Sequence, residues 1–122
     1  GIGMPLLQSK IGSTDASIIQ AYKITRFEQL GSSYRLRAQL EFTDGSLLYL
    51  RETVLEGIKR KYSYHWQNVD GNLLIRWDNA PDWEIETFPH HKHVGSQQNV
   101  VASYERTLEQ VLAVIENEIA AK

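Results

Sequence analysis

A run that alternates apolar and polar residues constrains the fold of this chain more than any other feature. From Tyr34 to Phe42 every second residue is apolar, and each residue between is charged or carries an amide. A period of two is typical of a β-strand that buries one face and exposes the other, whereas a helix repeats every 3.6 residues. The chain therefore needs a sheet with one buried face.

An Asp-Gly pair directly after this run predicts a hairpin. Asp44-Gly45 favours a two-residue type I′ turn, because both central residues of that turn need positive φ. With this turn, Arg51 opposes Ala38 and points into the apolar face. Two interpretations of Arg51 stay open: an arginine that snorkels or pairs at the sheet edge, or a phosphate ligand.

A second hairpin has Asp70-Gly71 at its centre. The predicted pairs are Trp66 with Ile75, His65 with Arg76, Tyr64 with Trp77, and Ser63 with Asp78. This register gives an aromatic face of Tyr62, Tyr64, Trp66, Ile75 and Trp77, and a polar face of Ser63, His65, Arg76 and Asp78. We expect the aromatic face to pack in the core.

The remaining pattern predicts a single α+β domain over residues 1–122. It has a five-stranded antiparallel meander sheet within 16–78, a long histidine-containing loop over 79–100, and one C-terminal helix over 103–121 packed on the sheet. Ser103 is the expected N-cap. Residues 1–10 read as a floppy N-terminus, partly because Gly1-Ile2-Gly3-Met4 resembles the remnant of an expression tag.

Composition excludes several classes. There are no cysteines, which excludes disulfides and thiol chemistry, and no apolar run reaches the roughly 20 residues that span a bilayer. We expect a cytoplasmic protein without membrane contact. The net charge is −2, but residues 1–80 carry ten Lys or Arg against eight Asp or Glu, and residues 81–122 carry three against seven. A local basic surface for phosphates is compatible with this split, as is an ordinary solvated surface.

Histidines gather in one segment, and we hypothesise one site from the polar groups around it. The candidate catalytic residues are His65, Arg76, Asp78, His90, His91, Lys92 and His93, and the candidate phosphate ligands are Arg51, Arg76 and Lys92. Histidine would transfer protons while Arg or Lys stabilises charge on a phosphate, with no cofactor. Alternatively His65, His90, His91 and His93, with Asp78 as a further oxygen ligand, bind a transition metal such as zinc or nickel, or haem. A polar loop with structural histidines is the third option.

Several motifs together resemble one family. They are Phe42-Thr43-Asp44-Gly45-Ser46, Tyr62-Ser63-Tyr64-His65-Trp66-Gln67, Asp70-Gly71, Arg76-Trp77-Asp78-Asn79-Ala80-Pro81 and Phe88-Pro89-His90-His91-Lys92-His93. Over residues 40–120 this pattern is similar to the TumE-type toxins of bacterial toxin–antitoxin systems. The resemblance implies a cytoplasmic toxin with a cognate antitoxin, and RNA or translation as the commonest target class.

The leading hypothesis is therefore a toxin that cleaves RNA without a metal. The first alternative is a small metal- or haem-binding protein that uses the four histidines without catalysis, and the second is a toxin that only blocks a partner protein. Whether the chain is an enzyme stays open at this point. So does its oligomeric state, with a homodimer as one option.

Overall fold

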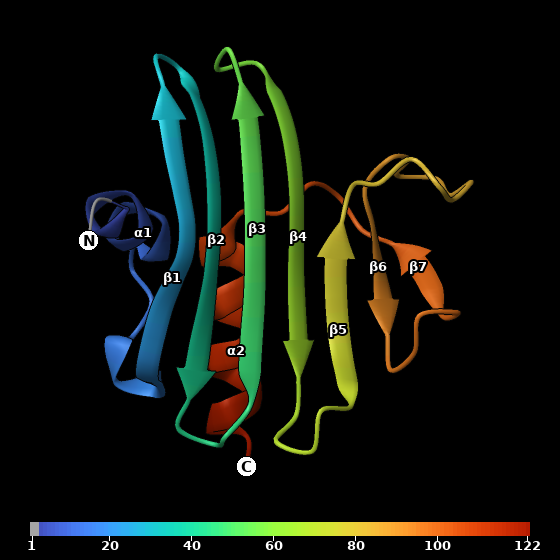
Figure 1. The fold of residues 1–122 in the computed structure, drawn as a ribbon. Helices are drawn as coiled ribbons and strands as arrows, with labels where there is room; N and C mark the ends of the chain where they lie inside the picture. The colour runs from blue at the N-terminus through green and yellow to red at the C-terminus, as the bar shows by residue number, and fades with distance from the viewer. Residues whose placement is uncertain (1–2) are drawn as a thin grey trace.

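The computed structural model describes residues 3–122, so Gly1 and Ile2 of the expected tag-like segment lie outside the described residues. The chain forms one antiparallel sheet of seven strands in which every strand pairs with the next along the chain (Figure 1). The strands are β1 (Ile19–Leu30), β2 (Ser33–Phe42), β3 (Leu47–Leu55), β4 (Lys59–Gln67), β5 (Leu73–Asp78), β6 (His91–Val94) and β7 (Val100–Ala102). The helices are α1 (Met4–Ile11), the 3₁₀ turn η1 (Ala16–Ile18) and α2 (Leu108–Ala120).

The predicted α+β class and meander order are confirmed, but the predicted five strands are wrong. There are two further short strands: β6 lies inside the segment 79–100 that was expected to be loop, and β7 begins at the last residue of that segment. Strands of four and three residues are too short to show a period, and β6 forms because β5 offers it a free edge.

A helix replaces the expected floppy terminus. α1 begins at Met4 with Pro5 in its first turn, and Leu7 is fully buried against the core. Lys10 reaches the buried carboxylate of Glu52, with Nζ 2.7 Å from Oε2. Burial of Leu7 and the ion pair of Lys10 hold the helix in place. A sequence of eight residues is too short for a helical repeat of apolar residues to predict this helix.

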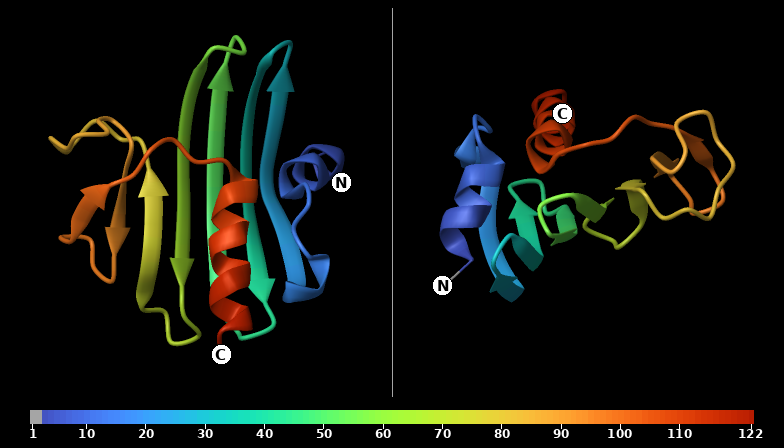
Figure 2. Two further views of the ribbon diagram at one scale, coloured as in Figure 1. Left: turned by 180° about the vertical axis from the view of Figure 1, so that it is seen from behind. Right: turned by 90° about the horizontal axis from the view of Figure 1, so that it is seen from above.

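The predicted C-terminal helix is confirmed, and it covers one face of the sheet (Figure 2, right). It begins at Leu108 and not near Ser103. Thr107 caps it: its hydroxyl accepts from Gln110 N at 3.3 Å while Gln110 Oε1 accepts from Thr107 N at 3.0 Å. This reciprocal capping box satisfies two free N–H groups, which an isolated Ser103 hydroxyl cannot do.

The register predicted for the first hairpin is wrong by one residue. Phe42 N donates to Ser46 O and Gly45 N donates to Phe42 O, so the loop has three residues with Gly45 at φ 84°. Arg51 therefore pairs with Arg37 and not with Ala38. As a consequence Arg51 leaves the apolar face, and Glu52 takes a buried position there with 2% of its surface exposed.

The second hairpin has the predicted pairs, although its turn is also a three-residue loop. The longer loop alone would shift the strand pairing by one residue. A bulge between the Trp66–Ile75 and Gln67–Leu73 pairs shifts the pairing back by one residue. The aromatic face is thereby confirmed as core: Tyr64 is fully buried, and Trp77 exposes only 2%.

Candidate functional site

The face of the sheet opposite α2 carries the polar residues, and we call it the open face (Figure 2, right). Cross-strand pairing lines up its side chains in two adjacent rows. The first row, from β1 to β6, is Arg26, Arg37, Arg51, Ser63, Asp78 and His91. The second is Lys23, Gln39, Tyr49, His65, Arg76 and His93. Five of the seven predicted catalytic residues therefore share one surface: His65, Arg76, Asp78, His91 and His93.

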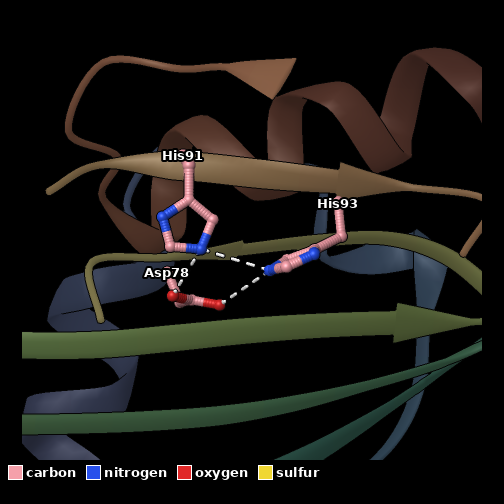
Figure 3. Close-up of side chains that lie close together, drawn as sticks. All are labelled: Asp78, His91 and His93. Atoms are coloured by element: carbon pink, nitrogen blue, oxygen red, sulfur yellow. Dashed lines mark hydrogen bonds and ion pairs between the residues drawn. The ribbon is translucent and has the colours of Figure 1, made fainter. Parts of the chain in front are cut away.

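His91, His93 and Asp78 converge at the β5–β6 end of these rows (Figure 3). His91 Nε2 lies 2.9 Å from Asp78 Oδ1 and 3.1 Å from His93 Nε2, and His93 Nε2 lies 3.5 Å from Asp78 Oδ2. All three residues are buried, with 1%, 4% and 5% of their surfaces exposed for His91, His93 and Asp78. We call them the Asp–His–His cluster.

The other ring nitrogen of each histidine is held by a backbone carbonyl. His91 Nδ1 lies 2.9 Å from Pro89 O, and His93 Nδ1 lies 2.8 Å from Gln97 O. A carbonyl oxygen can only accept, so each Nδ1 carries a hydrogen and donates it. In neutral His91 and His93 both Nε2 atoms therefore present lone pairs toward Asp78.

The motif from Arg76 to Ala80 builds the other side of the cluster. Arg76 Nε donates to Asp78 Oδ2 at 3.1 Å, and Ala80 N donates to Asp78 Oδ1 at 3.0 Å. Asn79 holds the chain to β4: its Oδ1 accepts from Tyr62 N at 3.0 Å and its Nδ2 donates to Arg60 O at 2.8 Å. These bonds fix the Asp78 carboxylate on the open face, while Trp77 between them points into the core.

His65 lies beside Arg76 on the neighbouring strand, with its Nδ1 3.4 Å from Arg76 Nη1. Burial lowers the pKa of His65, the positive charge of Arg76 lowers it further, and a hydrogen bond with Gln67 offsets this in part. His65 is therefore neutral at pH 7, which is the form that accepts a proton.

Arginines fill the middle of the open face. Arg37 and Arg51 are direct cross-strand partners, and within residues 3–122 neither forms an ion pair. Burial and then the charges of Arg37 and Arg76 lower the pKa of Arg51, although it remains a cation at neutral pH. A pocket joins this area to the Asp–His–His cluster; its lining includes Arg35, Arg51, Lys61, Ser63, Arg76 and Asp78.

Two predicted residues lie away from this site. Lys92 pairs with Trp77, so it belongs to the face that packs on α2. His90 Nδ1 lies 2.9 Å from the hydroxyl of Tyr62, and the two rings stack at 5.8 Å. Burial raises the pKa of that Tyr62 to about 12, so it stays a neutral hydrogen-bonding group.

Sequence reasoning missed two parts of the site. It did not include Arg37, the cross-strand partner of Arg51, although the polar side of the alternating run already placed Arg35 and Arg37 on one face. It also gave Trp83 no position, whereas the ring lies 5.7 Å from the His93 ring and 6.5 Å from the His91 ring. Trp83 lies in an irregular segment, and no repeating sequence pattern could predict which residues it contacts.

The fold and the site define a small α+β protein with a one-sided sheet, a row of arginines on its open face and a buried Asp–His–His cluster. The family model described as Toxin TumE matches residues 9–120, nearly the whole chain, and the chain belongs to this family. The resemblance seen in the sequence is thereby confirmed. Membership makes the chain a toxin of a toxin–antitoxin system and implies an antitoxin as its partner.

No curated protein and no solved structure matches the chain. Within residues 3–122 no helix is long and apolar enough to cross a membrane.

Proposed function

We propose that this toxin acts in the cytoplasm by cleaving RNA, with the phosphates of the strand bound across the open face of the sheet. The cleavage uses the 2′-hydroxyl of the RNA as nucleophile and needs no metal at the phosphate. Arg51 and Arg76 bind the phosphate, and His65 is the general base.

The pairing of Arg37 with Arg51 supports this proposal most. Like charges directly opposite on two strands destabilise a sheet, and the described chain offers neither residue an acidic partner. Arg26 extends the row to the sheet edge, although Glu28 pairs with it at 2.7 Å. A polyanion that lies along the row would replace the repulsion with attraction.

The chemistry follows from the neighbourhood of Arg76. Neutral His65 takes the proton of a 2′-hydroxyl, and the 2′-oxygen attacks the adjacent phosphorus. Arg76 and Arg51 stabilise the added negative charge, because preorganised cations next to a developing charge lower the barrier. The 5′-oxygen leaves and takes a proton from water, so the products are a 2′,3′-cyclic phosphate and a 5′-hydroxyl.

Asp78 contributes by holding Arg76. The Nε–Oδ2 contact of 3.1 Å fixes one edge of the guanidinium. Nη1 lies 3.4 Å from His65 Nδ1, and Nη2 is left for a phosphate. Because Ala80 N also donates to Asp78, at 3.0 Å from Oδ1, the carboxylate and with it Arg76 are positioned before the substrate arrives.

The test is cleavage of a labelled single-stranded RNA by the purified toxin, combined with growth arrest on induced expression. We expect cyclic-phosphate ends, and no cleavage of the same strand with 2′-deoxyribose. His65→Ala and Arg76→Ala should each reduce the rate by about 100-fold or more, the range expected for loss of a general base or of transition-state stabilisation.

Two further variants are controls at residues that the structure places away from the site. Lys122→Ala removes an exposed positive charge that pairs with Asp44 far from the open face, and it should leave cleavage unchanged. His90→Gln should also retain activity, because His90 lies on the opposite face. Cleavage of the 2′-deoxy strand, or full activity of His65→Ala at equal soluble levels, would refute the mechanism.

A further inference from the structure

We propose that Asp78, His91 and His93 form a binding site for one divalent transition-metal ion, with Zn²⁺ as the natural first choice. This proposal is independent of RNA cleavage, because metal binding is measured without RNA. It assigns a different ligand set from the four histidines considered above. His90 lies on the opposite face, and Arg76 stands between His65 and His93 in their row.

The two histidine rings are oriented so that their free nitrogens face each other. Pro89 O and Gln97 O take the Nδ1 hydrogens, which leaves both Nε2 lone pairs aimed into the same space only 3.1 Å apart. Asp78 adds a carboxylate to that space. Three electron-rich groups that face each other repel unless a cation lies between them.

The spacing of the two Nε2 atoms and the carboxylate oxygens is close to that of ligands around one ion. Zinc binds histidine nitrogen and carboxylate oxygen at about 2.0 to 2.2 Å, so the ligands of a tetrahedral ion lie roughly 3.3 to 3.6 Å from each other. His91 Nε2 lies 2.9 Å from Asp78 Oδ1 and 3.1 Å from His93 Nε2, and His93 Nε2 lies 3.5 Å from the other carboxylate oxygen, Oδ2. Small outward movements of the side chains are therefore enough to admit an ion.

Hydrogen bonds from the surrounding chain support both rings and the carboxylate. Metal-binding histidines commonly donate their other N–H to a carbonyl, which fixes the tautomer and the direction of the ring. Both histidines do so here, and Ala80 N and Arg76 Nε hold the carboxylate. The rings and the carboxylate are buried, with Trp83 next to both rings. Nitrogen and oxygen ligands without thiolates suit zinc, nickel or iron.

A bound ion would tie β5 to β6 next to Arg76. His91 and His93 come from a strand of four residues at the end of an irregular segment, and Asp78 ends β5. The ion would thus hold this part of the open face together. Three protein ligands also leave one position for water or another ligand.

The experiment is calorimetric titration of Zn²⁺ into protein purified without metal-affinity resin and freed of metal with a chelator. We expect one ion per chain, together with a rise in Tm. His91→Gln and His93→Gln should each weaken binding by about 100-fold or more. Loss of a residue that only supports a ligand already weakens metal binding by up to about 100-fold, and loss of a ligand itself should cost at least as much. His90→Gln is the matched control and should bind as the wild type does.

X-ray absorption at the zinc edge identifies the ligands in the wild-type protein, so this measurement tests the site even if a cluster variant fails to fold. In the wild-type complex we expect two imidazole ligands and additional oxygen ligands at about 2.0 to 2.2 Å. No binding at micromolar Zn²⁺ would overturn the proposal and leave a proton shared among the three groups. Unchanged affinity in folded His91→Gln and His93→Gln would overturn it as well, since the ion would then bind elsewhere.

Discussion

At the residue scale, His65 is the residue whose environment sets a pH dependence. Tyr49 from β3 and Arg76 from β5 flank it in its row, and only Arg76 carries a charge at neutral pH. Burial and Arg76 together keep the imidazole in its neutral form below the pH at which a free histidine would accept a proton.

The pKa of His65 should accordingly lie below its ordinary value of about 6.5. Arg76→Gln removes a positive charge from its side and should raise that pKa, while the burial contribution remains. Titration of the histidine ring signals by NMR measures both values. A His65 pKa at or above 6.5 in the wild type would contradict the assignment, and Lys122→Ala, which removes a distant charge, should leave the pKa unchanged.

The same shift has a consequence for stability. The folded-state pKa is lowered while the unfolded chain retains about 6.5, so as the pH falls the unfolded state binds the proton first. His65 therefore lowers the free energy of unfolding as the pH drops from about 6.5 to the folded-state pKa, and it has no effect above that window. In urea denaturation, the free energy of unfolding should depend less steeply on pH within this window for His65→Gln than for the wild type.

Glu52 is the second residue with an unusual environment. It exposes 2% of its surface on the face that packs against α1 and α2. Lys10 Nζ lies 2.7 Å from it, Arg60 Nη2 lies at 3.5 Å, and the hydroxyl of Tyr64 donates to it. A buried charge is tolerated only with such partners.

Glu52→Ala should destabilise the fold by about 3 to 5 kcal/mol, because Lys10 is left partly buried without its carboxylate and Arg60 keeps only its exposed acidic partner Glu105. Denaturant unfolding measures the loss. Glu28→Ala is the control: Glu28 also pairs with an arginine, at 2.7 Å, but on the surface, where such a pair contributes no more than about 1 kcal/mol. Equal losses for the two variants would show that the buried network has no special weight.

At the element scale, α2 begins where side chains satisfy its first N–H groups. Thr107 and Gln110 form a reciprocal pair, and Leu108 follows directly with its side chain in the core. The free N–H groups at a helix start are otherwise met by water alone.

Thr107→Ala should cost about 1 kcal/mol of unfolding free energy, the usual value for loss of an N-cap. Thr43→Ala is a matched control, since Thr43 is likewise exposed but its side chain forms no hydrogen bond among the described residues. Chemical denaturation of both variants decides the point. An equal change in the two would remove the cap as the reason that the helix begins at residue 108.

The two hairpins show how one turn type leads to two outcomes. Both Asp-Gly pairs form three-residue loops, so both shift the pairing by one residue relative to a two-residue turn. In the first hairpin the shift persists and moves Arg51 to the open face. In the second, the bulge after Trp66 reverses it and returns His65 to a position opposite Arg76.

At the scale of the whole molecule, helices cover one face of the sheet and leave the other for function. Mainly apolar side chains meet α1 and α2, and the arginine row and the Asp–His–His cluster share the opposite face. The overall charge of −2 therefore does not describe the surface that would meet a substrate.

Salt dependence of RNA binding tests this arrangement. For single strands the slope of log K against log salt changes by about 0.7 for each phosphate contact. Arg37→Ala and Arg51→Ala should each reduce the slope by about that amount in fluorescence anisotropy titrations. Lys122→Ala carries the same change in net charge away from the open face and should leave the slope unaltered. A slope that follows net charge alone would contradict a specific phosphate path.

Much of the fold was predictable because it depends on local patterns. The alternation over 34–42 required a one-sided sheet, and the helical spacing near the C-terminus required a covering helix. The family motifs, too, were readable without coordinates. The polar face of the second hairpin was correct because alternation and the pairing of His65 with Arg76 agreed.

The remaining features depend on contacts between residues that are distant in sequence, and no local pattern reveals such contacts. β6 exists because β5 has an edge to pair with, and that pairing selects His91 and His93 as partners of Asp78 while it turns His90 and Lys92 to the other face. Strand alternation makes this choice all or none, since a shift of one residue reverses every side chain. The residue types available for a site are set by the amino-acid sequence, whereas the register of one four-residue strand sets which of them meet.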